Sequence, residues 1–404
     1  MKSRRSFLKK GITGVAGLSL FPAACQKDRG AQEQGAREKK VVTRTLGKTG
    51  LTLPLVNMGV MNADNPNLVK VALDRGIVML DTAHYYMYGR NEEMIGGVIK
   101  DYPRDAYVIA TKARATTVDR HTRLETEDVQ AETFESFIKK FELSLLRLGL
   151  TYVDILYLHS VKSKEDAMIE HIVGAMEKLK QDGKVRHVGL STHGNEPEVI
   201  RAAADSGFYE VVLTSYNFLQ AHREEVESAI AYAAGAGLGI VAMKTQAGVY
   251  WDRERSQRIN MKAALKWVLQ NENVHTTIPG FTTYDQLEED LAVMEDPTLT
   301  PKDKEDLQLG MDLKFDGLYC QQCGACLEQC DRKVEIPTLM RSYMYLYGYR
   351  NLAAAKQTLQ SLDMPAIPCE RCNPCLVNCS RGFDIKNRMV DIARLKYVPQ
   401  DFLV

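Results

Sequence analysis

Short apolar runs rich in β-branched residues alternate with longer segments of helical periodicity between residues 41 and 300. The runs that predict strands are Leu55–Val60, Ile77–Thr82, Tyr107–Thr111, Val153–Leu158, Val185–Ser191, Glu210–Ser215, Gly239–Met243 and Thr276–Pro279. The clearest helical patterns between them are Glu132–Leu148, Ala167–Gln181, Arg223–Ala236 and Met261–Leu269. Apolar strands that alternate with helices indicate a parallel sheet covered on both faces. Eight such strands in about 250 residues predict an α/β fold, the (β/α)8 or TIM barrel.

An open, doubly wound sheet is the alternative for the same alternation of elements. That fold carries a G-x-G-x-x-G turn after its first strand, and no such turn follows Leu55–Val60. In a barrel, chemistry belongs at the C-terminal ends of the strands. Asp81 lies at the end of the second predicted strand, ahead of Tyr86, while Lys112 directly follows the third and His159 directly follows the fourth. Singly, each residue has an ordinary structural explanation, but together they converge on one mouth of the barrel.

Eight of the nine cysteines follow one spacing, C-x2-C-x2-C-x3-C, which occurs twice near the C-terminus. In bacterial two-cluster ferredoxins the fourth Cys of such a run ligates the other cluster. The spacing therefore predicts two [4Fe-4S] clusters, the first on Cys320, Cys323, Cys326 and Cys379 and the second on Cys369, Cys372, Cys375 and Cys330. Structural zinc prefers two separated C-x2-C pairs. A disulfide framework suits small secreted domains that lack a core.

The segment between the two cysteine runs has a helical pattern over residues 337–362. Its length favours a ferredoxin domain of the α-helical type, as in electron-transfer subunits of larger complexes. Four tyrosines in it are expected to pack the helix onto the barrel or around the clusters, with a stacking surface as the alternative: Tyr343, Tyr345, Tyr347 and Tyr349. Residues 294–315 are polar and acidic and are interpreted as a connection between domains. The predicted domains are residues 1–40, 41–300 and 301–404.

The N-terminus has the pattern of an export signal. Arg4 and Arg5 precede a short, Gly-rich apolar stretch, which resembles the twin-arginine signal of proteins exported in the folded state. A chance basic N-terminus is the alternative. Small residues before Cys25 resemble a lipoprotein processing site, with simple cleavage nearby as the competing interpretation. We expect a periplasmic or cell-envelope protein whose only attachment to a membrane would be a lipid on Cys25.

Composition gives no sign of a nucleic-acid partner. The chain has 52 Lys and Arg residues and 52 Asp and Glu residues, so no excess positive charge is present to bind phosphates. The expected partners are a small-molecule carbonyl or alcohol substrate and a redox partner protein.

Four separated motifs resemble the aldo-keto reductase family over residues 43–293. The loop that begins at Asp81-Thr82-Ala83 is similar to the family's D-T-A-x-x-Y-G-x-G-x-[SN]-E signature, with Met87 in place of the first Gly. Residues 109–112, 152–159 and 183–191 resemble the family's lysine strand, its histidine strand and the strand that follows. The resemblance implies hydride transfer with NAD(H) or NADP(H), and it makes the catalytic tetrad Asp81, Tyr86, Lys112 and His159.

In these roles Tyr86 would move the proton of the substrate oxygen, and Lys112 would stabilise the phenolate and lower its pKa. Asp81 would hold Lys112, and His159 would hydrogen-bond the substrate oxygen. The resemblance also implies cofactor contacts from Ser191, Thr192, Tyr216, Met243, Pro279, Gly280, Glu289 and Asp290. No Lys or Arg occurs from Thr276 to Asp290, and a 2′-phosphate prefers charged partners, so NAD is favoured over NADP.

Three functions compete on the sequence alone. The first is an exported oxidoreductase that interconverts a carbonyl and an alcohol, such as a sugar, with clusters that pass electrons one at a time. The second is an electron-transfer or docking protein with a catalytically weak barrel. The third is an ordinary nicotinamide-dependent reductase in which the clusters only hold the C-terminal segment together.

Overall fold

The computed structural model describes residues 41–115, 133–247, 260–312, 318–320, 322–360, 362, 367–399 and 402. The predicted export signal and Cys25 lie outside these residues. Within the described part of the chain, no helix combines the length and the apolar character needed to cross a membrane.

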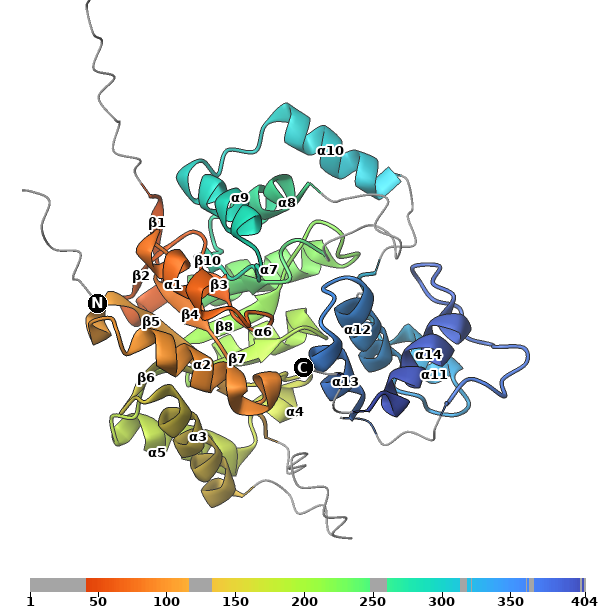
Figure 1. The fold of residues 1–404 in the computed structure, drawn as a ribbon, viewed down its shortest axis with the longest axis horizontal. Helices are drawn as coiled ribbons and strands as arrows, with labels where there is room; N and C mark the ends of the chain where they lie inside the picture. The colour runs from red at the N-terminus through yellow and green to blue at the C-terminus, as the bar shows by residue number, and fades with distance from the viewer. Residues whose placement is uncertain are drawn as a thin grey trace, which may run out of the picture. The chain divides into compact units, whose positions relative to one another are not determined.

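Eight parallel strands form the sheet, in the order in which they occur in the chain (Figure 1). They are β3 (Met58–Gly59), β4 (Met79–Asp81), β5 (Val108–Ala113), β6 (Val153–Leu158), β7 (Val185–Thr192), β8 (Val211–Ser215), β9 (Gly239–Met243) and β10 (Thr276–Thr277). A parallel bridge between Val56 and Thr277 joins the two edges of the sheet. The predicted (β/α)8 barrel is therefore confirmed, and each predicted strand overlaps one of these eight.

The barrel is closed at its seam by a buried asparagine. The Nδ2 of Asn57 donates to the carbonyl of Pro54 (3.0 Å) and to Oγ1 of Thr276 (2.8 Å). Its Oδ1 accepts from the backbone N–H groups of Val78 (3.1 Å) and Met79 (2.7 Å). Buried backbone groups need hydrogen-bond partners, and β3 and β10 are too short to supply all of them through a long ladder. The side chain of Asn57 provides some of the missing hydrogen bonds.

An antiparallel hairpin, β1 (Thr43–Thr45) and β2 (Thr52–Pro54), precedes the barrel. Leu46 and Leu53 from this hairpin are fully buried in the same cluster as Met79 and Tyr157 of the barrel strands. The backbone N–H of Lys48 donates to the carbonyl of Gly237, just before β9, at 2.9 Å. The hairpin therefore covers the end of the barrel where the strands begin, and leaves the other end open for chemistry.

Helices follow the strands and bury their apolar faces against them. They are α1 (Pro66–Asp74), α2 (Arg90–Ile99), α3 (Phe134–Leu148), α4 (Lys164–Ala167), α5 (Glu170–Gln181), α6 (Glu196–Asp205), α7 (Arg223–Gly235), α8 (Met261–Leu269) and α9 (Tyr284–Glu295). The helix expected over residues 167–181 is α5 from Glu170 onward, and its first expected residue, Ala167, is instead the last residue of α4. Ser163 caps α4, and Met168 follows its last residue in a non-helical conformation.

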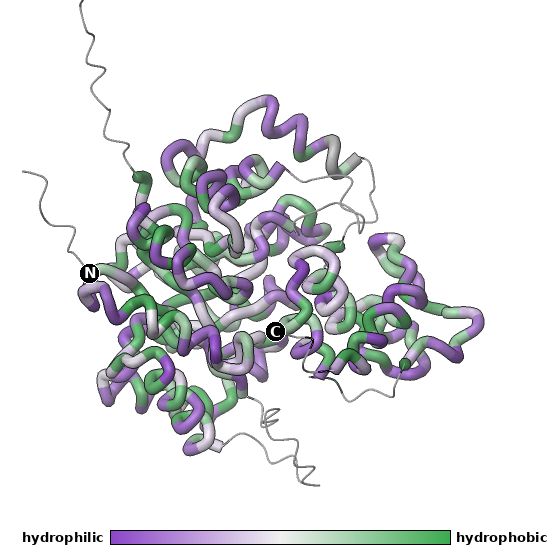
Figure 2. Tube along the Cα trace, viewed as in Figure 1, coloured by the Kyte–Doolittle hydropathy of each residue, from purple (hydrophilic) through white to green (hydrophobic). Residues whose placement is uncertain are grey.

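The C-terminal part of the described chain contains helices and no strand. These are α10 (Pro301–Asp312), α11 (Ala325–Gln329), α12 (Ile336–Tyr347), α13 (Leu352–Gln360) and α14 (Ile385–Ala393). Helix α10 occupies most of residues 294–315, the segment interpreted as a connection between domains. The mostly hydrophilic α10 (Figure 2) is tied to α8 through Lys266 and Asp303, 3.4 Å apart. The single helix expected over residues 337–362 is interrupted at Gly348, which ends α12.

Candidate active site at the C-terminal ends of the barrel strands

Lys112 is the centre of the predicted tetrad. It lies on β5, and its Nζ donates to the carboxylate of Asp81 at the end of β4. The same ammonium donates to the carbonyl of Thr82 at 2.7 Å and to the hydroxyl of Tyr86 at 3.4 Å. The structure thus brings three of the four predicted residues into one chain of hydrogen bonds.

Burial governs the protonation of this group. It raises the pKa of Tyr86 above its usual value, while the charge of Lys112 lowers it by less. Lys112 therefore acts on Tyr86 in the expected direction but does not bring its pKa below the ordinary value. Burial lowers the pKa of Lys112 itself, but Asp81 and Tyr86 raise it by more, so the ammonium stays charged. Tyr86 is accordingly a protonated hydroxyl beside a fixed cation at neutral pH.

His159 completes the tetrad at the end of β6. Its ring centroid is 6.1 Å from that of Tyr86 and the two planes are nearly perpendicular. Burial first, and then the charges of Arg114, Lys112 and Arg341, hold the pKa of His159 well below its usual value. Its Nδ1 has no hydrogen-bond partner in the described part of the structure. A neutral imidazole in this position can donate one N–H to a substrate oxygen without adding charge.

The loop that carries Tyr86 has an unusual backbone. Met87 and Tyr88 have φ values of 51° and 57°, in the left-handed region. Side chains other than glycine reach this region at a cost of about 1–3 kcal/mol, which is the physical reason for a glycine in the signature at position 87. The neighbouring Gly89 has φ 91°, and the guanidinium of Arg147 occupies the space where its Cβ would lie.

The end of the signature holds the loop in place. Asn91 accepts from the hydroxyl of Thr82 (2.6 Å) and donates to the carbonyl of Val60 (2.8 Å). The buried Glu92 accepts from Thr111 at 2.7 Å. These contacts join the loop to the ends of the first three barrel strands, so the final Asn and Glu of the signature position Tyr86 rather than react.

A cavity of about 190 Å³ opens at these strand ends. All four predicted catalytic residues line it. So do residues of α12, of α13 and of the connection between these two helices, namely Arg341, Tyr345, Tyr349, Ala354, Gln357, Thr358 and Gln360. The hydroxyl of Tyr88 donates to Gln360 at 2.6 Å, and Asn351 donates to Asn62 at 2.6 Å. The segment between the cysteine runs therefore forms one wall of the barrel's reaction chamber.

Comparison with known proteins agrees with the family resemblance seen in the sequence. The profile of the aldo/keto reductase family matches residues 56–263, which is just over half of the chain. The chain belongs to the aldo/keto reductase family. It is 26% identical over 309 residues to L-galactose dehydrogenase of Arabidopsis thaliana, covering 66% of this chain and 92% of that protein. It is 32% identical over 168 residues to the aldo-keto reductase YhdN of Bacillus subtilis, covering 41% of this chain and 46% of that protein.

A solved structure shares the fold. The aldo-keto reductase AKR11C1 from Bacillus halodurans, in its holo form, superposes with a TM-score of 0.54 at 23% identity, covering 67% of this chain and 96% of that one. The protein is therefore an NAD(P)-dependent oxidoreductase of this family, with a barrel to which a helical C-terminal segment is added.

The predicted cofactor residues of this aldo/keto reductase fall into two groups. Ser191, Met243, Pro279 and Gly280 line the cavity with the tetrad. The other four do not line it: Thr192, Tyr216, Glu289 and Asp290. Tyr216 packs its ring on Trp267, 5.0 Å between centroids, and donates its hydroxyl to Glu227 at 2.7 Å. Its predicted contact with the cofactor is therefore not supported by this placement.

Asp290 lies behind the cavity wall and accepts from Gln246 at 3.2 Å. Burial and the nearby Glu289 raise the pKa of Asp290 to about 8, so its carboxyl is largely protonated at neutral pH. Neither Asp290 nor Glu289 therefore offers a charged group to a cofactor in the cavity.

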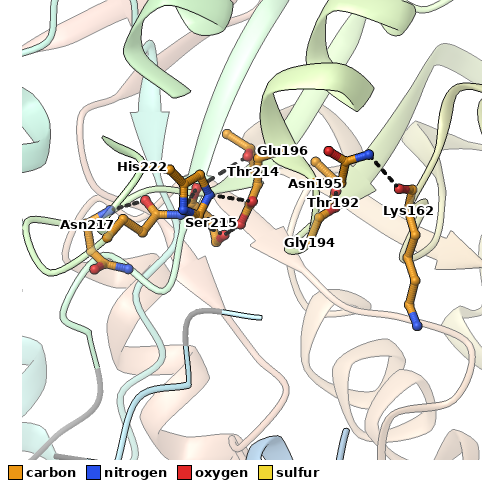
Figure 3. A network of polar contacts seen from close by, with 10 residues as sticks. Lys162, Thr192, Gly194, Asn195, Glu196, Thr214, Ser215, Asn217 and His222 are labelled. Carbon is orange, nitrogen blue, oxygen red and sulfur yellow. Dashed lines mark hydrogen bonds and ion pairs between the residues drawn. The ribbon is translucent and has the colours of Figure 1, made fainter. Parts of the chain in front are cut away.

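A buried carboxylate organises the ends of β7 and β8 (Figure 3). Glu196, the first residue of α6, accepts from the hydroxyl of Ser215 at 2.5 Å and lies 3.0 Å from Nε2 of His222. Although burial raises the pKa of Glu196, hydrogen bonds from His222 and Ser215 lower it by more. Next to it, Thr192 donates to the carbonyl of Gly194 at 3.0 Å. Thr192 therefore belongs to this structural network.

Several cavity residues were missed by reasoning from the sequence. Arg114 lies two positions after Lys112, on the same side of an extended chain, so the period of two in a strand was a usable signal. Arg341, Tyr345 and Tyr349 recur every four residues, which places them on one side of a helical segment. Lys244 directly follows the last residue of β9. No local pattern shows that α12 faces the barrel, because that contact is made across the fold.

The eight C-terminal cysteines gather in the combinations that the ferredoxin spacing predicts. A small cavity is lined by Cys320, Cys323, Cys326 and Cys379. Burial raises the pKa of the Cys369 thiol to about 11. A smaller contribution comes from three nearby cysteines, Cys372, Cys330 and Cys375. Gln329 and Asn378 exchange hydrogen bonds of 3.3 and 2.7 Å between the two runs. In the described residues no three His, Cys, Asp or Glu side chains are arranged to hold a single metal ion.

Proposed function

We propose that the protein interconverts a carbonyl and an alcohol by hydride transfer, and that its cysteine runs hold two [4Fe-4S] clusters. The observation that carries the proposal is the hydrogen-bonded group of Asp81, Lys112 and Tyr86 in a cavity shared with His159. A protonated hydroxyl, a fixed cation and a neutral imidazole are what reduction of a carbonyl requires.

In the direction of reduction, His159 donates a hydrogen bond to the carbonyl oxygen and sets its angle. Negative charge grows on that oxygen as the carbon is reduced, and Tyr86 delivers its proton there. Lys112 stabilises the phenolate that remains, because its ammonium lies 3.4 Å from the hydroxyl. Asp81 keeps Lys112 charged and oriented. Oxidation of an alcohol uses the same residues in reverse, with Tyr86 as the base.

The residues present fit a nicotinamide, which would supply or accept the hydride. Ser191 lies at the end of β7 and lines the cavity, where its hydroxyl can reach a carboxamide. Met243 offers a polarisable surface for a ring. Pro279 and Gly280 lie at the start of the segment that would follow the adenosine side. We propose NAD rather than NADP, since no basic residue occurs from Thr276 to Asp290.

The cysteines fit clusters better than a single ion. A zinc ion draws four ligands to one point, each about 2.0–2.3 Å from the metal, whereas each thiolate of a [4Fe-4S] cube binds a different iron. The small cavity lined by Cys320, Cys323, Cys326 and Cys379 lies where the predicted first cluster would be held. When bound, such clusters transfer single electrons.

A second candidate function is electron transfer with a weak reductase activity. The charge of Cys320 affects the pKa of Lys244, which lines the main cavity, so the predicted first cluster lies near the chamber. Electrons from the chamber would then have a short route to that cluster and on to a partner protein. The interpretation of the clusters as inert staples has no such supporting contact.

Nucleotide content separates these functions. We expect anaerobically purified full-length protein to release a nicotinamide dinucleotide on denaturation, or to bind added NAD with NADP at least about tenfold weaker, because residues 276–290 offer no basic side chain to a 2′-phosphate. Isothermal titration calorimetry measures both affinities. A protein that carries iron and sulfide but binds neither dinucleotide would reject hydride transfer and leave the electron-transfer function.

We also propose export through the twin-arginine route, followed by residence in the periplasm or cell envelope with lipid on Cys25. The support is Arg4 and Arg5 ahead of an apolar stretch, together with cofactors that require folding before export. Changing both Arg4 and Arg5 to Lys should leave the protein in the cytoplasm. Cell fractionation of the variant against the wild type checks this, and a Lys9→Arg variant is the control for exchanging one basic side chain for another at unchanged charge. Equal export of all three proteins would reject the route.

A further inference from the structure

The main cavity has three basic side chains beyond the catalytic group. Arg114 follows β5, Lys244 follows β9 and Arg341 lies in α12. Among the described residues that line the cavity, Asp81 is the only acid, and its carboxylate is already bound to Lys112. Burial and the charge of Arg341 lower the pKa of Lys244 to about 7, so Arg114 and Arg341 carry the permanent positive charge, and no free acid among the described lining residues pairs with them.

Arg114 has a hydrogen-bond donor for which the described protein atoms supply no acceptor. Its Nε is buried and has no hydrogen-bond partner among the described residues. Its guanidinium lies 5.5 Å from the ring centre of Tyr85, which orients the plane but satisfies no N–H. A buried donor without a partner costs about 1–3 kcal/mol, and more when it is charged. An acceptor on a bound ligand would remove that cost.

Arg341 presents the second charge from the opposite side of the fold. It is contributed by the helix between the two cysteine runs, and its closest polar contact is a marginal one of 3.5 Å to Nε2 of His193. It forms no ion pair within the described residues. Because Arg341 is 227 residues after Arg114 in the chain, only the packing of α12 on the barrel mouth brings the two into one cavity.

Both guanidinium groups lie near the place where the substrate oxygen would bind. The pKa of His159 is lowered mainly by burial and further by the charges of these two arginines. The pKa of Arg114 is likewise lowered by burial and by the charge of Arg341. Guanidinium groups bind carboxylate and phosphate with paired hydrogen bonds, which a lysine cannot do. The arrangement fits an oxyanion held a short distance from the reacting carbon.

We propose that Arg114 and Arg341 form an oxyanion-binding subsite that selects substrates with a carboxylate or a phosphate beside the reacting carbonyl or alcohol. Sugar acids, hydroxy acids and sugar phosphates are the classes that fit. The substrate class rests on the proposed hydride transfer, but binding of the oxyanion does not. The other source of such a group is the pyrophosphate of the dinucleotide, and the experiment separates the two.

The test is calorimetric binding to anaerobically purified, cluster-loaded, full-length protein at neutral pH. The probes are D-glucuronate, D-glucose 6-phosphate, neutral D-glucose, and NAD. We expect the wild type to bind at least one charged sugar about tenfold or more tightly than glucose. Arg341→Gln and Arg114→Gln should each weaken that binding about 10- to 100-fold, the usual loss for one charged hydrogen-bond donor, and leave the affinity for NAD unchanged. Arg341→Lys should restore part of it.

Arg201→Gln is the matched control, since Arg201 lies on α6 with its guanidinium on Ser228 at 2.8 Å. It should bind every probe as the wild type does. Loss of NAD affinity in the two cavity variants, with charged sugars unaffected, would assign the cations to the dinucleotide and overturn the proposal. Failure of the wild type to prefer either charged sugar over glucose would overturn it as well. If NAD does not bind but the charged sugars do, the subsite stands and hydride transfer fails.

Discussion

Replacing Tyr86 with Phe should reduce turnover by roughly 10²–10⁴-fold, the usual contribution of a general acid or base. Phe keeps the ring and deletes the hydroxyl that lies 3.4 Å from Nζ of Lys112. The loss should fall on kcat, because the hydroxyl acts on the substrate oxygen only as charge develops there. Steady-state kinetics with a substrate found among charged sugars and their alcohols measure the effect.

The rates of reduction and oxidation should respond to pH in opposite directions. Burial raises the pKa of Tyr86 above its ordinary value, so the proton needed for reduction is present throughout the neutral range. Reduction by the wild type should therefore fall only at strongly alkaline pH, while oxidation should rise towards it. The residual activity of Tyr86→Phe should lack both trends.

Tyr232→Phe is the control, because its hydroxyl is bound to Asp205 on the outside of the barrel at 2.6 Å. It should match the wild type in activity. If Tyr86→Phe converts the substrate at the wild-type rate, the catalytic assignment of Tyr86 is wrong, whichever cofactor is bound.

The barrel could be predicted because its strands are apolar along their whole length. Val153–Leu158 and Gly239–Met243 were predicted with the observed ends, since both are buried among neighbours on each side. The strands at the seam were predicted too long. There the backbone hydrogen bonds between the first and last strands are supplemented by the side chain of Asn57, which bonds to Thr276 and to the backbone of Met79. The hydrophobic pattern alone does not reveal this role of a buried polar side chain.

The catalytic group was predictable for a related reason. Asp81, Lys112 and His159 each end a strand, and a barrel brings such ends together. The cavity wall made by α12 was not predictable, because the sequence fixes which residues face one side of a helix but not what that side meets. Tyr345 and Tyr349 pack against the hydrophobic cluster of the C-terminal segment, as expected, and they also line the chamber.

The signature loop shows how a departure from a family pattern is tolerated. Met87 stands where the family has glycine, and its backbone is left-handed at φ 51°. The conformation persists because Asn91 and Glu92 fix the next helix to neighbouring strands on both sides. The surrounding contacts therefore impose the turn that glycine would otherwise make easy.

Removing Cys330 should abolish the cluster held by the second cysteine run rather than the one held by its own. The wild type should contain about eight iron atoms and eight labile sulfides per chain, as two [4Fe-4S] clusters require. Cys330→Ala should lower both numbers to about four. The physical reason is the interleaving of the runs, because Cys330 lies close enough to Cys369 to affect its pKa, while Cys379 shares a cavity with Cys320, Cys323 and Cys326.

Two further variants identify the lost cluster. Cys372→Ala removes a ligand predicted for the second cluster and Cys323→Ala one predicted for the first. Under exchanged ligation, the electron paramagnetic resonance spectrum of dithionite-reduced Cys330→Ala should match that of Cys372→Ala. A match to Cys323→Ala would instead show that each run binds its own cluster. Cys25→Ala is the control and should keep the full iron content, because Cys25 is the one cysteine outside both runs.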